Sequence, residues 1–481
     1  ILDVNMSALS RREVLKLMAS ASIVPAFLST VCRAESDPWE AALRIRSAIQ
    51  LPEIPDNDFA ITDFGAVGDG EMDCSSAIAR AIAAAHEAGG GRVVIPGGVF
   101  MTGHVHLESH IDLHIQEGAT LSFIPEPERY LPPVFTRWEG VEFMGLSPLI
   151  YAFGKTDVAV SGAGILNGGA DATHWWPWKG KWKGKFIDAE YTQKEARTRL
   201  FAEAEAGVPP QDRHYADGAY LRPPFIQFYR CENVLVEDIT ITQSPFWLIN
   251  PVLSESVTVR GVTCRSMGPN SDGCDPESCK NVLIEDCVFD TGDDCIAIKS
   301  GRNADGRRLG VPSENIIVSG CKMLAGHGGV VMGSELSGGI RNVFVENCQM
   351  SSPDLERGIR IKTNAMRGGG VTNLNVRNLE IGTVRDLFVI NFYYEEGENG
   401  PFTPVVQDIN IQNITCETAD RVMDVRGFDH ALIRDIRLTD ITVREAGEPS
   451  RISNVEGLVF NNVSVNGAPV SKPADLLAGS G

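Results

Sequence analysis

The chain has 481 residues, of which 43% are hydrophobic, 22% are charged and 48 are glycine. This is the composition of a soluble globular protein, and the glycine content favours many tight turns over long helices. The formal net charge of −20 excludes nucleic acid and anionic membranes as general partners, because the field of the whole molecule repels them. A local basic patch can still bind an acidic substrate.

The N-terminal segment resembles a twin-arginine export signal. Arg11 and Arg12 precede an apolar stretch over residues 17–31, which ends near Ala34. Residues 1–34 are therefore predicted to be cleaved after Ala34, giving a periplasmic or secreted protein. An amphipathic helix packed on the protein and a lipoprotein site at Cys32 are the alternatives. The rest of the chain has no apolar stretch of about 18 residues, so we expect no membrane span in the mature protein.

The first predicted helix covers residues 73–88, after a lead segment at 35–57. Asp73, Ser75 or Ser76 can cap its start, and the glycines at 89–91 end it. A solenoid exposes an unpaired apolar end, so this helix is predicted to cap that end.

A short repeat follows, composed of Asn or Asp, an aliphatic residue, any residue and a second aliphatic residue. Its copies begin at Asn233, Asn281, Asn315, Asn342, Asn373, Asp408, Asp435 and Asn454, with Ser256 leading one more copy and Asp157 an earlier one. Period-two alternation makes each copy a β-strand with one buried face. The leading residue is typical of a turn position with left-handed backbone.

The spacing of these strands predicts the architecture. They lie about 20 to 35 residues apart, mostly without an amphipathic helix between them, so they cannot form βαβ units. They are predicted to stack as coils of a single-domain, all-β parallel β-helix over residues 58–465. Residues 166–225 interrupt the pattern as an insertion over one face, and residues 466–481 form a C-terminal tail. A leucine-rich repeat would need a regular Leu framework and an Asn ladder, neither of which we expect here.

Three cysteines share one position of the repeat. Cys287, Cys321 and Cys348 stand six residues after the leading residue, where other copies have aliphatic residues. We interpret them as buried thiols and not as metal ligands or redox groups. Their stacking leaves a disulfide open as an alternative.

Polar motifs recur at coil-like intervals. Asp272 to Asp293 is 21 residues, as is Cys274 to Cys295, and three further steps of 34, 33 and 33 residues lead to His327, Arg360 and Tyr393. These residues, with Asp294, Lys362 and either Tyr393 or Tyr394, are predicted to line one groove. Adjacent strand residues face opposite sides, so a bend at Gly292 is needed for Asp293 and Asp294 to share it. Clustered carboxyl groups cannot all stay ionised, so one is expected to hold a proton.

These motifs resemble those of the family 28 glycoside hydrolases, the polygalacturonase family of right-handed parallel β-helices. The family motifs Asn-Thr-Asp, Gly/Gln-Asp-Asp, Gly-His-Gly and Arg-Ile-Lys correspond to residues 270–272, 292–294, 326–328 and 360–362, with Ser271 in place of Thr. The resemblance runs from about residue 58 to 460.

The resemblance implies a role for each matched residue. Asp293 would be the general acid, Asp272 and Asp294 would hold and deprotonate the attacking water, and His327 would support the acid. Arg360 and Lys362 would bind the substrate carboxylate, with Asn270 and Tyr393 also placed in substrate binding. No metal or cofactor is implied. The family inverts, yet stacked coils start about 5 Å apart, closer than the roughly 6.5 to 9.5 Å of inverting carboxylate pairs.

The expected substrate is polygalacturonate or a pectic oligosaccharide, attacked by a monomer from a chain end. Five arginines near the motifs suit uronate carboxylates, namely Arg302, Arg307, Arg308, Arg357 and Arg367. Trp175, Trp176 and Trp178 in the insertion either stack on sugar rings or anchor the insertion. The insertion is large enough to close one end of the groove. A hydrolase of another pectic region such as rhamnogalacturonan, and a non-catalytic carbohydrate-binding β-helix, remain as alternatives.

Overall fold

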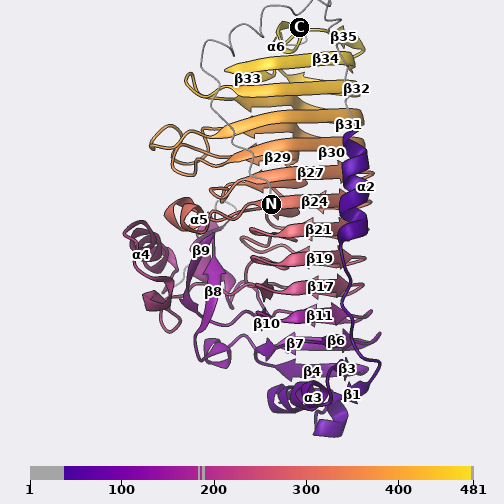
Figure 1. Ribbon diagram of the computed structural model, residues 1–481, viewed down its shortest axis with the longest axis vertical. Helices are drawn as coiled ribbons and strands as arrows, with labels where there is room; N and C mark the ends of the chain where they lie inside the picture. The colour runs from indigo at the N-terminus through magenta and orange to yellow at the C-terminus, as the bar shows by residue number, and fades with distance from the viewer. Residues whose placement is uncertain (1–36, 183–184, 187–189, 478–481) are drawn as a thin grey trace, which may run out of the picture.

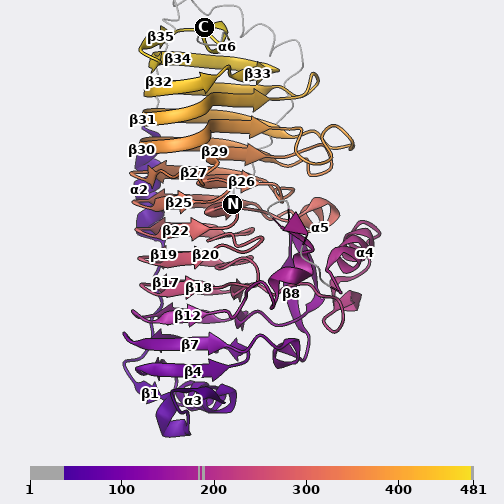
Figure 2. The same cartoon turned by 180° about the vertical axis from the view of Figure 1, so that it is seen from behind.

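The computed structural model describes residues 37–182, 185–186 and 190–477, so the predicted export signal lies outside the described residues. Its strands stack as successive coils along one long axis, with parallel pairing between coils (Figures 1 and 2). The predicted right-handed parallel β-helix is confirmed. None of the described helices is long and apolar enough to cross a membrane.

Each coil contributes strands to up to three parallel faces. The first face contains the predicted repeat: β1 Asp58–Ala60, β3 Gly91–Ile95, β6 Ile111–Ile115, β11 Thr156–Ser161, β17 Glu232–Glu237, β19 Glu255–Arg260, β21 Lys280–Glu285, β24 Ser313–Ser319 and β27 Ile340–Glu346. The second face contains β2 Asp69–Asp73, β4 Gly98–Thr102, β7 Ala119–Phe123, β12 Ile165–Asn167, β18 Thr240–Thr242, β20 Thr263–Ser266, β22 Val288–Thr291, β25 Lys322–Ala325 and β28 Gln349–Met350.

The third face carries the polar motifs. Its strands are β5 Val105–His106, β10 Ile150–Phe153, β16 Ile226–Tyr229, β23 Ile296–Ile298, β26 Val330–Gly333, β29 Arg357–Lys362 and β33 Arg451–Ser453. Toward the C-terminus the corners between faces straighten, and single long strands run through them: β30 Gly370–Asn391, β31 Val405–Arg426, β32 Ile433–Glu448 and β34 Val455–Val465.

The interior is a set of aliphatic stacks held in register. Val282 pairs with Ile316, which pairs with Val343, and all three are fully buried. A one-residue slip would turn every such side chain to the outside, so the burial of each full side chain, at about 1.5–3 kcal/mol, also fixes the register. Cys287, Cys321 and Cys348 occupy one of these stacks. All ten cysteines in the described part of the chain are buried free thiols, which confirms the thiol interpretation over a disulfide.

The residues that lead the repeat have the predicted left-handed backbone, with φ between 54° and 61°. Their side chains also form a ladder that we did not expect from the sequence. Asn315 donates to Asn281, Asn342 to Asn315 and Asn373 to Asn342, each at 2.9 Å. The expectation of no Asn ladder is therefore wrong. A leading amide satisfies its own turn and also reaches its copy in the next coil, about 4.8 Å away.

Both ends of the solenoid are covered. The predicted capping helix is α3 Ser75–Glu87, which follows the short helix η1 Ile61–Phe64 and packs its apolar face on the first coils. Asp73 accepts hydrogen bonds from the backbone N–H and hydroxyl of Ser75 at its start. At the C-terminal end β34 pairs with β35 Ala468–Val470, and α6 Ala474–Leu477 follows.

A further helix, α2 Pro38–Ala48, lies across the outside of the first face (Figure 1). Trp39 and Ala42 cover Leu283, Ile317 and Phe344, which point outward from consecutive coils. The sequence analysis assigned this region only to a lead segment.

A lateral lobe projects beside the third face (Figure 1). Between β12 and β16 the chain forms η3 Trp176–Lys179, β13 Lys181–Trp182, β14 Lys185–Phe186, α4 Lys194–Glu205, η4 Pro210–Asp212 and β15 His214–Tyr215. An earlier hairpin, β8 Val134–Trp138 and β9 Val141–Gly145, and α5 Asn303–Leu309 pack on it, while η2 Pro127–Tyr130 precedes the hairpin. The pairing of Arg213 with Asp305 at 2.8 Å, fully buried, joins the insertion to α5.

Candidate active site

Asp293 and Asp294 lie at the corner between β22 and β23. The backbone bends at Gly292, as predicted. A Cβ at Gly292 would lie 2.2 Å from the carbonyl oxygen of Gly268, so only glycine fits this close approach of two coils. The bend lets two consecutive carboxyl groups face one side.

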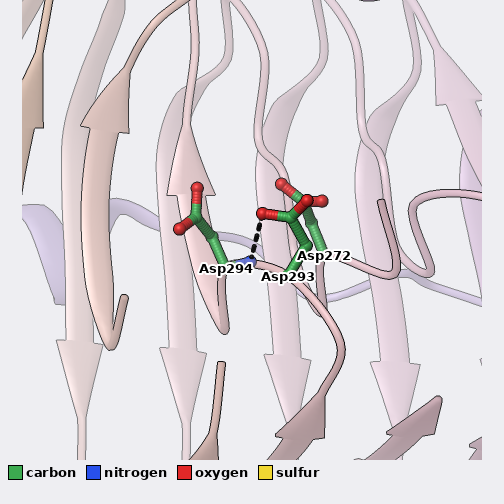
Figure 3. Close-up of side chains that lie close together, drawn as sticks. All are labelled: Asp272, Asp293 and Asp294. Atoms are coloured by element: carbon green, nitrogen blue, oxygen red, sulfur yellow. Dashed lines mark hydrogen bonds between the residues drawn. The ribbon is translucent and has the colours of Figure 1, made fainter. Parts of the chain in front are cut away.

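Three carboxyl groups converge at this corner. One oxygen each from Asp272, Asp293 and Asp294 lie within 4.8 Å of one another, and Figure 3 shows the three side chains directed to the same side. The backbone N–H of Asp294 donates to Asp293 at 3.0 Å. The true register differs from the 21-residue step, however, because Cys274 pairs with Ile296. Asp272 is therefore aligned with Asp294 and not with Asp293.

His327 stacks on Asp293 in the next coil. Its Nδ1 lies 2.9 Å from Asp293 Oδ1, and its Nε2 lies 4.0 Å from Glu356. Gly326 pairs with Leu355, so the residue aligned with His327 is Glu356 and not Arg360. Equal steps of 33 residues had placed Arg360 in this column, but the register puts it opposite Val331.

Arg360 and Lys362 still reach the cluster because their side chains are long. Lys362 Nζ lies 2.6 Å from Asp294 Oδ2, and Arg360 Nη1 lies 3.7 Å from Asp294 Oδ1. Burial lowers the pKa of Lys362, but the charge of Asp294 outweighs this and leaves the pKa above its ordinary value. Asp294, which is fully buried, thus faces two cations.

Asp272 and Asp293 differ in their charge environments. Burial, together with the like charges of Asp275 and Asp293, raises the pKa of Asp272 well above its usual range. Burial also raises the pKa of Asp293, but the hydrogen bond and charge of His327 reverse this and hold it below its usual range. The hydrogen bond to Asp293 in turn raises the pKa of His327. One proton is therefore held by the Asp293–His327 pair and another by Asp272.

Carboxylate oxygens this close together can also bind a divalent cation. Here Lys362 already contacts Asp294, and Arg360 approaches its other oxygen. Because the protein's own cations balance the charge, we do not interpret the cluster as a metal site.

The cluster opens into a pocket of about 460 Å³ between the third face and the lobe. Asn270 lies at its edge and donates to Asp293 at 3.5 Å. From the lobe and its hairpin the pocket is lined by Glu139, Lys179, Lys181, Trp182 and Arg197. The insertion thus forms one wall of the site.

The structure distinguishes the two candidate tyrosines. Tyr394 lines the pocket and lies beside Arg360 and Lys362, whose cationic groups are 5.6 and 5.5 Å from its ring centroid. Tyr393 is instead 41% exposed and packs edge-on against Phe428. Tyr393 is therefore not part of the pocket, because consecutive residues after β30 face different sides.

Two of the five predicted arginines, Arg302 and Arg357, line the pocket. The other three hold the scaffold: Arg307 binds backbone carbonyls, Arg308 pairs with Glu142, and the fully buried Arg367 pairs with Glu395. The three insertion tryptophans also anchor structure, with Trp175 packed on Tyr130 and on Trp178, and Trp176 donating to a backbone carbonyl.

Several site residues were missed by the sequence analysis. Arg222 is fully buried and donates to Asn270 Oδ1 at 2.7 Å, which fixes that amide beside Asp293. Lys299, Trp247 and Glu335 also line the pocket. Lys299 stands in the segment Ile296–Lys299 directly after the Asp-Asp motif, and its alternation with buried aliphatic residues was the one available signal.

Comparison with known proteins agrees with this geometry. The model of the glycosyl hydrolases family 28 matches residues 213–465. An exopolygalacturonase from Thermotoga maritima, of known structure, is 44% identical, with a TM-score of 0.86 over 90% of this chain and 96% of that one. An exo-poly-α-D-galacturonosidase of Dickeya chrysanthemi is 26% identical over 84% of this chain and 70% of its own length. A probable polygalacturonase of Vitis vinifera is 27% identical over 83% and 77%. The chain belongs to the glycosyl hydrolases family 28 and is a glycoside hydrolase.

Proposed function

We propose that the protein hydrolyses α-1,4-galacturonosidic bonds in polygalacturonate and pectic oligomers. The observation that carries this proposal is a carboxylate cluster set in a cationic pocket on a chain of net charge −20. The cations that line the pocket are Lys179, Lys181, Arg197, Lys299, Arg302, Arg357, Arg360 and Lys362. Such groups bind uronate carboxylates by charge-assisted hydrogen bonds. The names of the similar exo-acting enzymes support the same substrate.

Asp293 is the proposed general acid. Its side chain is 17% exposed toward the pocket, whereas Asp272 and Asp294 are almost fully enclosed. The proton shared with His327 passes through Asp293 to the glycosidic oxygen as the bond to the anomeric carbon breaks. His327 then takes up a proton again from solvent, which its exposed fraction of 45% permits.

Asp272 and Asp294 are the proposed acceptors for the attacking water. The water's oxygen bonds to the anomeric carbon and its proton passes to a carboxylate of this pair. Lys362 and Arg360 keep Asp294 ionised for this role, and they also extend toward the space where a substrate carboxylate would bind. Water addition balances the proton given to the leaving sugar.

Attack from a chain end follows from the shape of the pocket. The lobe and its hairpin form a wall through Glu139, Lys179 and Arg197, and Glu139 is tied to Arg197 at 2.7 Å. A walled pocket accepts a terminal sugar better than an internal one. We propose a monomeric, exported enzyme whose catalytic domain spans residues 58–465 behind a signal at 1–34.

A substrate with a leaving group that needs no proton tests the acid assignment. Asp293→Asn should lose about 10²- to 10⁴-fold in kcat on polygalacturonate but far less on a galacturonosyl fluoride. Asp272→Asn and Asp294→Asn should lose activity on both substrates, because water activation is needed for each. The reverse pattern, with fluoride hydrolysis spared only in Asp272→Asn, would assign the acid to Asp272.

The stereochemical outcome is a separate test, because the carboxyl oxygens lie closer than inverting pairs usually do. We propose inversion, with a water held by both Asp272 and Asp294. Proton NMR in the first minutes of digestion should show a β-configured new reducing end. An α-configured one would contradict inversion.

A further inference from the structure

Lys299 is a buried cation next to the carboxylate cluster that has no part in the roles proposed above. Its side chain is 3% exposed, and its Nζ lies 3.7 Å from Asp272 Oδ2, 3.5 Å from Asp275 Oδ2 and 3.4 Å from Glu335 Oε2. The Nζ also lies 4.5 Å from the centroid of the Trp247 ring. This ammonium is thus held from several directions at one position.

The fold places Lys299 as a counterpart of Lys362. Ile298 pairs with Met332, and the next residue, Gly333, pairs with Lys362. Lys299 follows Ile298, so the two lysines occupy equivalent positions two coils apart. Lys362 contacts Asp294 from one side of the cluster, and Lys299 contacts Asp272 from the other.

Asp275 lies behind the cluster and is fully buried, and neither of its side-chain oxygens accepts a hydrogen bond from the protein. It competes with Asp272 for the single charge of Lys299. A buried carboxyl without donors is most stable when protonated, and a neutral Asp275 leaves the Lys299 charge to Asp272.

We propose that Lys299 is a positioning residue that keeps Asp272 ionised for water activation, with Asp275 protonated beside it. The proposal rests on the role of Asp272 in the proposed function. It explains how a carboxyl surrounded by other carboxyls, and almost closed to solvent, can still accept a proton.

The charges around the pair agree with this assignment. Burial, offset in part by the charge of Lys299, raises the pKa of Asp275 to about 8. Burial lowers the pKa of Lys299, but the surrounding carboxylates raise it well above its usual value, so it stays charged. The charged groups that face this pair from neighbouring elements are Asp293, Asp294 and Glu335, with Arg222 from the lobe.

The test compares the pH dependence of kcat/KM on polygalacturonate for matched variants. Loss of the cation in Lys299→Met should raise the pKa of Asp272, so the acidic limb should move to higher pH by about 1 to 3 units. Lys299→Arg, which keeps the charge, should restore the limb toward that of the wild type. Lys299→Gln, which keeps a hydrogen-bond donor, gives the same reading if Lys299→Met does not fold.

Asp275→Asn is the matched control, since it breaks the same buried cluster without removing the cation. It should not move the acidic limb upward. An unshifted limb in folded Lys299→Met or Lys299→Gln, or an equal upward shift in Asp275→Asn, would overturn the proposal. Lys155→Met, at a half-exposed ion pair with Glu108, should leave the profile unchanged.

A substrate-free measurement separates this proposal from the proposed function. Carbon-13 NMR of labelled aspartate, with the Asp272 signal assigned from Asp272→Asn, should show its pKa rising in Lys299→Met. If the wild type does not degrade polygalacturonate, the proposed function fails while this titration still decides the role of Lys299.

Discussion

At the scale of single residues, the site depends on which member of each neighbouring pair faces the pocket. Matched spacing brought Asp272, Asp293, His327 and Lys362 together correctly, because each lies at a corner or strand end of its own coil. It could not decide between Tyr393 and Tyr394, which differ by one position in a segment without strand periodicity. It also missed Arg222, whose partners are distant in sequence and whose role depends entirely on the folded lobe.

The two tyrosines provide a direct test of that correction. Tyr394→Ala should lower kcat/KM on oligogalacturonides by about tenfold, since an aromatic contact near the substrate is worth ~1 kcal/mol or more. Tyr393→Ala should stay within about twofold of the wild type, because it removes only an edge contact with Phe428. Steady-state kinetics of both variants measures this, and equal losses would contradict the placement of Tyr394 in the pocket.

The pair of His327 and Asp293 predicts a pH-dependent stability. The pKa of His327 is raised in the folded chain, so its stabilisation is fully present below the unfolded value of about 6.5. It is lost as pH rises through the folded pKa. The wild type should therefore exceed His327→Gln in stability by more at pH ~5 than at pH ~9. Urea unfolding at both values measures the difference, and a constant difference would refute the charged pair.

At the scale of elements, the corner before β23 is the most demanding piece of backbone. Gly292→Ala should displace the carboxylates, because its Cβ would lie 2.2 Å from the Gly268 carbonyl oxygen. We expect a loss of more than about tenfold in kcat, since small misplacements of catalytic groups are costly. Gly97→Ala, whose Cβ would meet its nearest atom at 3.9 Å, is the control. Comparable activity of the two variants would argue against a rigid corner.

The helix α2 should stabilise the molecule without affecting catalysis. Trp39 packs on Phe344 at 5.7 Å, and Arg377 lies over its other side at 3.8 Å. Trp39→Ala should therefore cost about 3 kcal/mol in the free energy of unfolding and leave kcat unchanged. Leu43→Ala, on the exposed side of the helix at 69% exposure, should change neither. A loss of activity in folded Trp39→Ala would show that α2 influences the pocket.

Elements with a strict period were predictable, and the others were not. The leading Asn or Asp and the alternating aliphatic residues located the strands of the first face and their left-handed turns. The helix α2 and the hairpin β8–β9 have no such period, and α5 is only 7 residues long. Register was also beyond the sequence, since a 21-residue step between cysteines differs from the 22 residues between Cys274 and Ile296, which pair.

At the scale of the whole molecule, the β-helix supplies a rigid row of strand ends and the lobe turns that row into a pocket. Parallel coils hold Asp272, Asp294 and Arg357 on successive turns, and buried pairs such as Arg213 with Asp305 fix the lobe against them. Net charge is strongly negative, while the pocket concentrates cations. This separation favours entry of a uronate terminus into the pocket over binding elsewhere on the surface.

The central claim is tested most directly by sizing the products of polygalacturonate digestion, with Asp293→Asn as the parallel control. We predict galacturonic acid units from the first minutes, little change in viscosity, no ultraviolet-absorbing unsaturated product, and near-complete loss of product in the variant. Long oligomers with a rapid fall in viscosity, or activity that survives Asp293→Asn, would contradict the account.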